Sequence, residues 1–153
     1  MPTLQFSRQI PVRHQVDIFI AGGGPAGVAA AVTAARQGKR VFLAEGQAAF
    51  GGMGTSGLVP AFMRFTDGVN FLAAGIGKEI YDRLKSRRAL MHDEPSAWVS
   101  IQVEDLKRIY DEMMAQSGAE FTFLTQVIAV EAEAGRIRLV VCAAQSGLLA
   151  DAA

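Results

Sequence analysis

Residues 16–45 read VDIFIAGGGPAGVAAAVTAARQGKRVFLAE, and this stretch decides the fold. The apolar run 16–21 is typical of a buried strand, and glycines follow it at once. Alanine and valine dominate 25–37, with no breaker in the interior of the segment, which predicts a helix. A second apolar run at 40–44 ends in Glu45. The order strand, glycine turn, helix, strand predicts a βαβ unit.

The turn of this unit carries the pattern Gly-x-Gly-x-x-Gly. Gly22 lets the chain turn sharply out of the strand, Gly24 lets the backbone approach a pyrophosphate, and Gly27 lets the helix pack closely on the sheet. The helix begins at Pro25 and Ala26, where free N–H groups and the positive end of the helix dipole attract phosphate. We therefore predict a dinucleotide site here. A degenerate unit that keeps the packing without the ligand is the alternative.

Glu45 ends the second strand, at the distance from the glycines where a carboxylate accepts hydrogen bonds from the adenosine ribose. A carboxylate there repels a 2′-phosphate, so Glu45 favours FAD or NAD and argues against NADP.

Length and charge narrow the range of functions. The chain has 153 residues, the size of one domain, and half of them are hydrophobic. Lys plus Arg equals Asp plus Glu at 15 each, so no global basic field recruits nucleic acid or anionic lipid. Residues 18–35 lack charged side chains, but their glycines and proline break any continuous helix. We expect no nucleic-acid partner, no membrane span and no signal peptide.

Cysteine and histidine are scarce. Cys142 is the single cysteine, which excludes an intrachain disulfide and a cysteine zinc cluster and suits a reducing, cytoplasmic setting. We interpret it as a small core residue of a strand, with a redox role as the alternative. His92, Asp93 and Glu94 could form one corner of a metal site, but no further His or Cys completes it. We predict no metal site.

The rest of the chain predicts two more helices and several strands. One helix is expected over 70–88, although Gly75 and Gly77 weaken its start. Another is expected from Val103, with a stripe of Met, Tyr and Ile that we assign to the core, and Gly118 ends it. Strands are expected at 10–12, 120–124, 127–132 and 136–142.

Residues 16–52 resemble the opening of FAD-dependent oxidoreductases of the glutathione-reductase-like group. The resemblance rests on GGGPAG at 22–27, Gly38, Val41 and Glu45, and on the pair Gly51-Gly52 beyond the acid. NAD-binding Rossmann domains generally lack that second pair. In the FAD-dependent oxidoreductases of this group, the second glycine pair lies against the cofactor between the ADP and the flavin. The resemblance therefore implies FAD, with NAD as the alternative.

The segment GGMGTSGLVPAF at 51–62 also resembles a bacterial FAD-dependent oxidoreductase family distantly related to fumarate reductase flavoproteins. The resemblance adds Gly51, Gly52 and Met53 to the cofactor-binding residues. It also implies that Met53, Gly54, Thr55 and Ser56 lie toward the flavin. None of these four is a recognisable base or nucleophile, so no catalytic residue is named.

The resemblance implies an α/β fold, a Rossmann-like FAD/NAD(P)-binding domain with a parallel sheet and a C-terminal β-meander. Members of the family continue into a strand ending in a T-G-D type motif and into a substrate domain. We therefore expect a leader at 1–15 and an incomplete FAD-binding domain at 16–153, in which 126–153 form the meander and tail.

Three hypotheses follow for the function. The first is the FAD-binding N-terminal portion of an oxidoreductase with an unknown small-molecule substrate. The second is a non-catalytic, truncated fragment whose open sheet edge needs the missing C-terminal portion or a strand from a second copy, which would form a homodimer. The third is an NAD-binding module.

Overall fold

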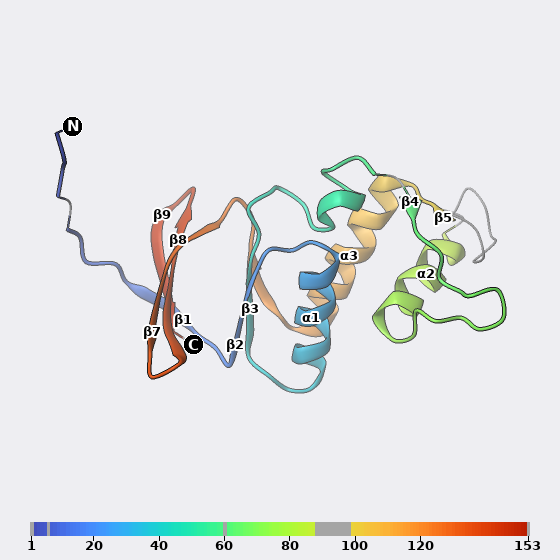
Figure 1. Ribbon diagram of the computed structural model, residues 1–153, viewed down its shortest axis with the longest axis horizontal. Helices are drawn as coiled ribbons and strands as arrows, with labels where there is room; N and C mark the ends of the chain where they lie inside the picture. The colour runs from blue at the N-terminus through green and yellow to red at the C-terminus, as the bar shows by residue number, and fades with distance from the viewer. Residues whose placement is uncertain (1, 6, 60, 88–98, 153) are drawn as a thin grey trace.

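The computed structural model describes residues 2–5, 7–59, 61–87 and 99–152. Its centre is a parallel sheet in the order β2-β3-β6, formed by Ile18–Ala21, Val41–Ala44 and Glu120–Thr122 (Figure 1). Helix α1 (Pro25–Arg36) connects β2 to β3 and completes the predicted βαβ unit. Gly38 follows the helix at φ +78°, which suits its predicted role as the stop.

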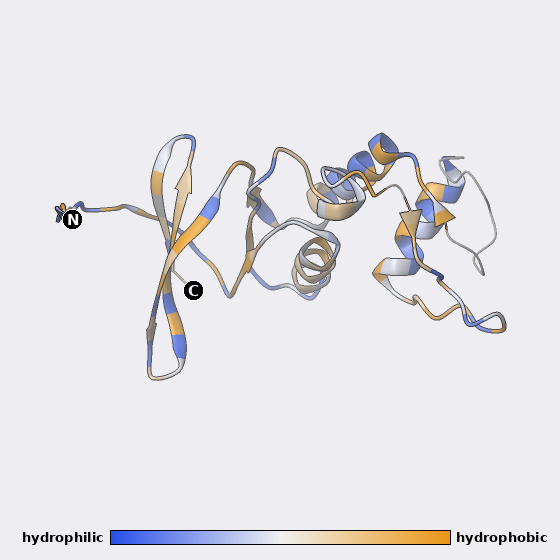
Figure 2. Cartoon of the chain, turned by 45° about the horizontal axis from the view of Figure 1, so that its top comes forward, coloured by the Kyte–Doolittle hydropathy of each residue, from blue (hydrophilic) through white to orange (hydrophobic). Residues whose placement is uncertain are grey.

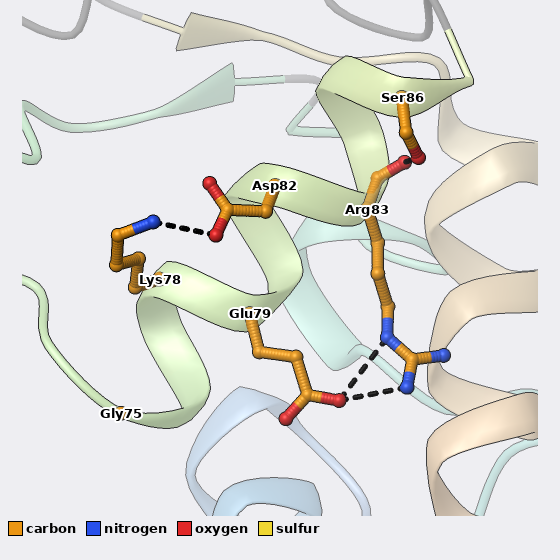
Figure 3. Close-up of a pocket in the computed structure, with 6 residues that line it drawn as sticks. All are labelled: Gly75, Lys78, Glu79, Asp82, Arg83 and Ser86. Carbon is orange, nitrogen blue, oxygen red and sulfur yellow. Dashed lines mark hydrogen bonds and ion pairs between the residues drawn. The ribbon is translucent and has the colours of Figure 1, made fainter.

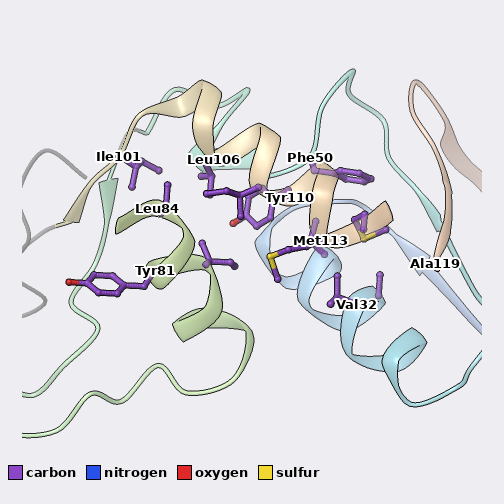
Figure 4. Close-up of a cluster of buried hydrophobic side chains, with 14 of the residues drawn as sticks. Val32, Phe50, Tyr81, Leu84, Ile101, Leu106, Tyr110, Met113 and Ala119 are labelled. Carbon is purple, nitrogen blue, oxygen red and sulfur yellow. The ribbon is translucent and has the colours of Figure 1, made fainter. Parts of the chain in front are cut away.

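Helices α1, α2 (Ile76–Ser86) and α3 (Val103–Ser117) lie on one side of the parallel sheet, with α1 next to the sheet and α2 farthest from it (Figure 1). Helix α3 packs on α1, and α2 packs on α3. The main hydrophobic cluster fills the spaces between them (Figure 4). The predicted core stripe of α3 is confirmed, because its apolar side chains are fully buried: Leu106, Ile109, Tyr110, Met113 and Met114.

A second sheet lies on the other side of the parallel sheet (Figure 1). It contains the antiparallel meander of β7 (Gln126–Glu133), β8 (Arg136–Ala144) and β9 (Gly147–Ala152). Figure 2 shows hydrophobic and hydrophilic residues alternating along the β7–β8 hairpin, as expected for strands with one covered face. The predicted strands of the meander are therefore present, and β9 extends it.

A smaller apolar cluster joins the two sheets. Phe42 and Ala44 of β3 meet Val140 and Cys142 of β8, and Val16 completes the cluster. Cys142 is fully buried, which confirms its predicted place in the core, and burial raises the pKa of its thiol to about 11. The thiol is therefore protonated at neutral pH.

The N-terminal residues differ from the prediction. The expected leader contains β1 (Val12–Gln15), which pairs in parallel with β9, so these four residues belong to the meander sheet. The strand expected over 16–21 starts at Ile18, because Val16 still donates its N–H to Ala152 O (3.0 Å) while Asp17 bonds to Arg40 O (2.9 Å). The chain crosses between the two sheets at this point.

The region before α2 also differs, because the helix expected from residue 70 begins at Ile76. The Asp67 carboxylate accepts the N–H groups of Val69 (2.8 Å) and Asn70 (2.7 Å), and this side-chain turn competes with helix formation. Gly75 then has φ +63°. A ribbon of β4 (Ala61–Phe62) and β5 (Val99–Ser100), which no sequence pattern predicted, is also present.

Candidate dinucleotide-binding site

The glycine turn lies at the carboxyl end of β2. Gly22 has φ +98° and donates its N–H to Ala44 O (2.8 Å), which places the turn beside the end of β3. A Cβ on Gly27 would lie 1.8 Å from Gly22 O and 3.5 Å from Ile20 Cγ2. Any side chain at position 27 would therefore collide with the backbone of the turn. This confirms the close helix-on-sheet packing predicted for Gly27.

The amino end of α1 is open to a ligand. Gly24 is the N-cap residue, no side chain caps the helix, and its first turn carries no acidic residue. Val28 N–H donates to Gly24 O (2.9 Å), so the N–H groups of Ala26 and Gly27 precede the first bond of the helix. A Cβ on Gly24 would meet no atom within 4 Å. Open N–H groups at the start of a helix are the arrangement that attracts phosphate in proteins.

Glu45 follows β3 and is buried, with 7% of its surface exposed. Its Oε2 accepts the N–H of Gly23 (2.5 Å), and its Oε1 accepts the N–H of Gln47 (2.6 Å). The carboxylate thus ties the glycine turn to the end of the central strand. Each oxygen keeps lone-pair capacity for a further donor, as a ribose hydroxyl would require.

The glycine pair folds back onto the glycine turn. Gly51 donates its N–H to Gly23 O (2.9 Å), and a Cβ on Gly52 would lie 3.3 Å from Gly24 Cα. Gly51 has φ +103° and Gly52 has φ +49°, conformations that favour glycine. The residues selected from two separate sequence segments therefore come together at the carboxyl ends of the strands of the parallel sheet.

The residues after the pair diverge. Met53 is the middle residue of the short helix η1 (Gly52–Gly54), and 66% of its surface is exposed. Gly54 and Thr55 are buried, and a Cβ on Gly54 would lie 3.2 Å from Leu106 Cδ2 of α3. The turn of η1 places Gly54 against α3, and the implied orientation of Gly54 and Thr55 toward the flavin stays a prediction. Ser56 is exposed.

A hollow of about 410 Å³ lies elsewhere, on α2 (Figure 3). Its charges are paired within the protein: Lys78 Nζ lies 2.6 Å from Asp82 Oδ2, and Arg83 Nη2 lies 2.7 Å from Glu79 Oε1. Hydrogen bonds from Arg36 and Arg83 hold the pKa of Glu79 at about 2, so it is ionised at neutral pH. Both pairs join residues one turn apart within α2, whereas the pair of Arg36 with Glu79 (2.7 Å) docks α2 on α1.

The corner His92-Asp93-Glu94, which was considered for a metal, lies outside the described residues. Within the described ranges, no three His, Cys, Asp or Glu side chains gather as metal ligands. No helix in the described part of the chain is long and apolar enough to cross a membrane.

The model of a family described as FAD dependent oxidoreductase matches residues 17–153. A comparison with curated protein sequences finds no significant match. The family match confirms the resemblance predicted from the sequence, the Rossmann-like α/β class, and FAD as the cofactor of this class of chain.

Solved structures share the fold. A geranylgeranyl bacteriochlorophyll reductase-like protein from Thermoplasma acidophilum superposes with a TM-score of 0.62 at 16% identity, over 92% of this chain and 38% of its own. The 3-ketosteroid-Δ4-(5α)-dehydrogenase from Rhodococcus jostii gives 0.63 at 16%, over 94% and 45%. Anhydrotetracycline hydroxylase from Streptomyces rimosus gives 0.63 at 16%, over 90% and 30%. The chain thus spans less than half the length of each.

Proposed function

Because this chain belongs to the FAD-dependent oxidoreductase family, we propose that it binds FAD and forms the FAD-binding portion of an oxidoreductase that acts on a small molecule. The observation that supports this most directly is the contact between the glycine turn and the glycine pair, where Gly51 N–H meets Gly23 O. A second glycine segment at this place extends the site beyond the pyrophosphate, in the direction a flavin dinucleotide needs and an ADP unit alone does not.

Each part of the site has a proposed role. The N–H groups at Ala26 and Gly27 hold the pyrophosphate, and the missing Cβ of Gly24 allows its approach. Glu45 accepts the ribose hydroxyls and repels a 2′-phosphate. Gly52 lets the cofactor pass close to the backbone, and Met53 contacts it beyond that point. When bound, the flavin supplies hydride and electron transfer, and the protein supplies position and electrostatics.

Titration of the purified chain with FAD, followed by flavin fluorescence, tests this proposal. Gly24→Val is the sharpest variant, because its side chain enters open space where only a ligand would be disturbed. We expect folding to be retained and FAD binding to fall by more than about 100-fold. Ala30→Val, on an exposed position of the same helix, is the matched control. A wild-type chain that binds no FAD would refute the proposal.

NAD is the alternative dinucleotide, because the glycine turn and Glu45 suit both cofactors. Competition between the two on the same sample separates them. Displacement of FAD by NAD at equal concentration would favour an NAD-binding module, whereas FAD retained against a large excess of NAD supports the proposal.

Assembly is a second proposal. Among the described strands, β2 lies at the edge of the parallel sheet, and a groove of about 680 Å³ runs between this edge and the β7–β8 hairpin. Its apolar lining includes Ile18, Val130 and Ile137, each more than a third exposed. We propose that a strand of a second copy covers this edge, so that the isolated chain is a non-catalytic homodimer.

Light scattering of the purified chain tests the assembly. Ile18→Lys places a charge at the edge of β2, and we expect it to convert the dimer to a monomer. Val69→Lys, at a loop position that is 89% exposed, is the control that changes charge alone. A wild-type chain that is monomeric at high concentration and oxidises a nicotinamide substrate would refute it.

We also propose a cytoplasmic location for the protein. It is supported by the use of the single cysteine, Cys142, as a buried and protonated core residue, which needs no oxidising compartment. Fractionation of the cells that produce the protein would test it directly.

A further inference from the structure

Thr55 is a polar residue that the proposed site does not use directly. It is fully buried between the glycine pair and α3. Its hydroxyl donates to Phe50 O (2.6 Å) and lies 3.4 Å from Gly52 O, and its backbone N–H donates to Gly52 O (3.1 Å). One residue therefore bonds to the carbonyls on both sides of Gly51.

The packing around Gly51 adds a second constraint. A Cβ on Gly51 would lie 2.5 Å from Thr55 Cγ2 and 2.8 Å from Tyr110 Cε2. The Thr55 methyl group and the edge of the Tyr110 ring thus close the inner side of Gly51. Its outer side bonds to Gly23 O in the glycine turn. The pair is held between the turn and α3, at the positive φ angles given above.

From this arrangement we propose that Thr55 is a positioning residue for FAD. Its hydroxyl holds Gly51 and Gly52 in the conformation in which their backbone can contact the cofactor beyond the pyrophosphate. Thr55 acts through the glycine pair, because burial separates its own side chain from any ligand. The inference rests on the proposed FAD site and deepens it.

Thr55 should affect the binding of only one part of FAD, the part beyond the ADP. ADP occupies the glycine turn and Glu45, whereas the remainder of FAD passes the glycine pair. Loss of the Thr55 hydroxyl loosens the pair and leaves the turn intact, since Gly22, Gly24 and Glu45 make no hydrogen bond to Thr55. FAD affinity should therefore fall while ADP affinity is kept.

Titrations of FAD and ADP against the 153-residue chain and its variants test this. Thr55→Val keeps the shape and removes the hydroxyl, and we expect FAD affinity to fall about tenfold, the order of one lost buried hydrogen bond, with ADP affinity within about twofold of wild type. Thr55→Ser keeps the hydroxyl and should restore FAD affinity to within about threefold. Val140→Ala, in the cluster between the two sheets, is the control that shows how a general loss of stability changes the affinities for FAD and ADP.

The outcomes separate the two proposals. If wild type binds no FAD, the proposed function fails and the role of Thr55 fails with it. If wild type binds FAD and folded T55V binds it equally well, only the role of Thr55 is refuted. Equal losses of FAD and ADP affinity in T55V, matching those of V140A, would also refute it. If T55V does not fold, T55S and T55A give the same comparison, because they differ only in the hydroxyl.

Discussion

The parallel sheet and the meander sheet lie against each other, yet they are built differently. All four residues of β3 are buried, because helices cover one face of the parallel sheet and the meander covers the other. Strand β7 is twice as long, and most of its residues are exposed. The difference indicates that the parallel sheet, which carries the candidate site, depends on close packing from both sides. The meander supplies one covering face and tolerates change on the other.

The largest expected effect contrasts a glycine of the βαβ unit with a glycine of the meander. Gly27→Ala places a Cβ 1.8 Å from Gly22 O, a backbone atom that cannot move without disrupting the βαβ turn. We expect a loss of more than about 3 kcal/mol in the free energy of unfolding. Gly135→Ala, in the β7–β8 turn at φ +77° with open space around it, should lose about 1 kcal/mol. Denaturant unfolding of both variants measures the contrast, and equal losses would contradict it.

A second comparison concerns buried charge in the meander sheet. Asp151 of β9 is 1% exposed, and neither carboxylate oxygen accepts a well-formed hydrogen bond from the described residues. Burial raises the pKa of Asp151, and the charge and backbone N–H of His14 together with the charge of Arg13 offset only part of that. A raised pKa in the folded state means that stability is greatest at low pH and falls as the pH rises through that pKa.

Asp151→Asn removes this penalty while keeping the shape of the side chain. At neutral pH we expect the variant to be more stable than wild type by about 1 kcal/mol, the order of the cost of a buried polar group without a partner. The gain should shrink as the pH falls through the raised pKa of Asp151, because the carboxyl group is then protonated in the folded protein. Thermal unfolding across this range measures it, and a variant less stable than wild type at pH 7 would show that the carboxylate is stabilising.

The helical layer should respond to acid in the opposite direction. Hydrogen bonds from Arg36 and Arg83 hold the pKa of Glu79 at about 2, below its usual 4.5. A lowered pKa contributes stability above the unfolded value, and that stability is lost as the pH falls from about 4.5 to 2. Because the pairs are partly exposed, we expect Glu79→Gln to lose only about 0.5–1 kcal/mol at pH 7. The difference from wild type should vanish near pH 2 in the same unfolding experiment.

The sequence predicted the parts of the molecule that depend on local chemistry. The glycine turn, α1 and the end of α3 at Gly118 follow from backbone conformations that glycine allows and from apolar spacing. The pairing of β1 with β9 joins residues far apart in the chain, and no local pattern signals it. The late start of α2 follows from the Asp67 turn, an aspartate side-chain signal present in the sequence but outweighed by the apolar spacing.

The candidate site also contains some residues that the sequence could identify and one that it could not place. The glycine turn and Glu45 could be selected from their spacing, and Gly51 and Gly52 from a resemblance. Thr55 could not be assigned its place, because its burial depends on the packing of η1 against α3, which the order of residues does not reveal.

The smallest expected effect concerns the contact between α3 and the glycine pair. The Tyr110 hydroxyl is buried and has no hydrogen-bond partner among the described residues, and burial raises its pKa to about 12. Its ring is fully buried and fills the space beside Gly51. Tyr110→Phe keeps the ring and removes an unpaired donor, so the free energy of unfolding should stay within about 0.5 kcal/mol of wild type or rise. Tyr110→Ala, which removes the ring, should lose about 3–5 kcal/mol. A large loss in Y110F would instead show that a buried water bonds to the hydroxyl, because only a lost hydrogen bond separates the two side chains.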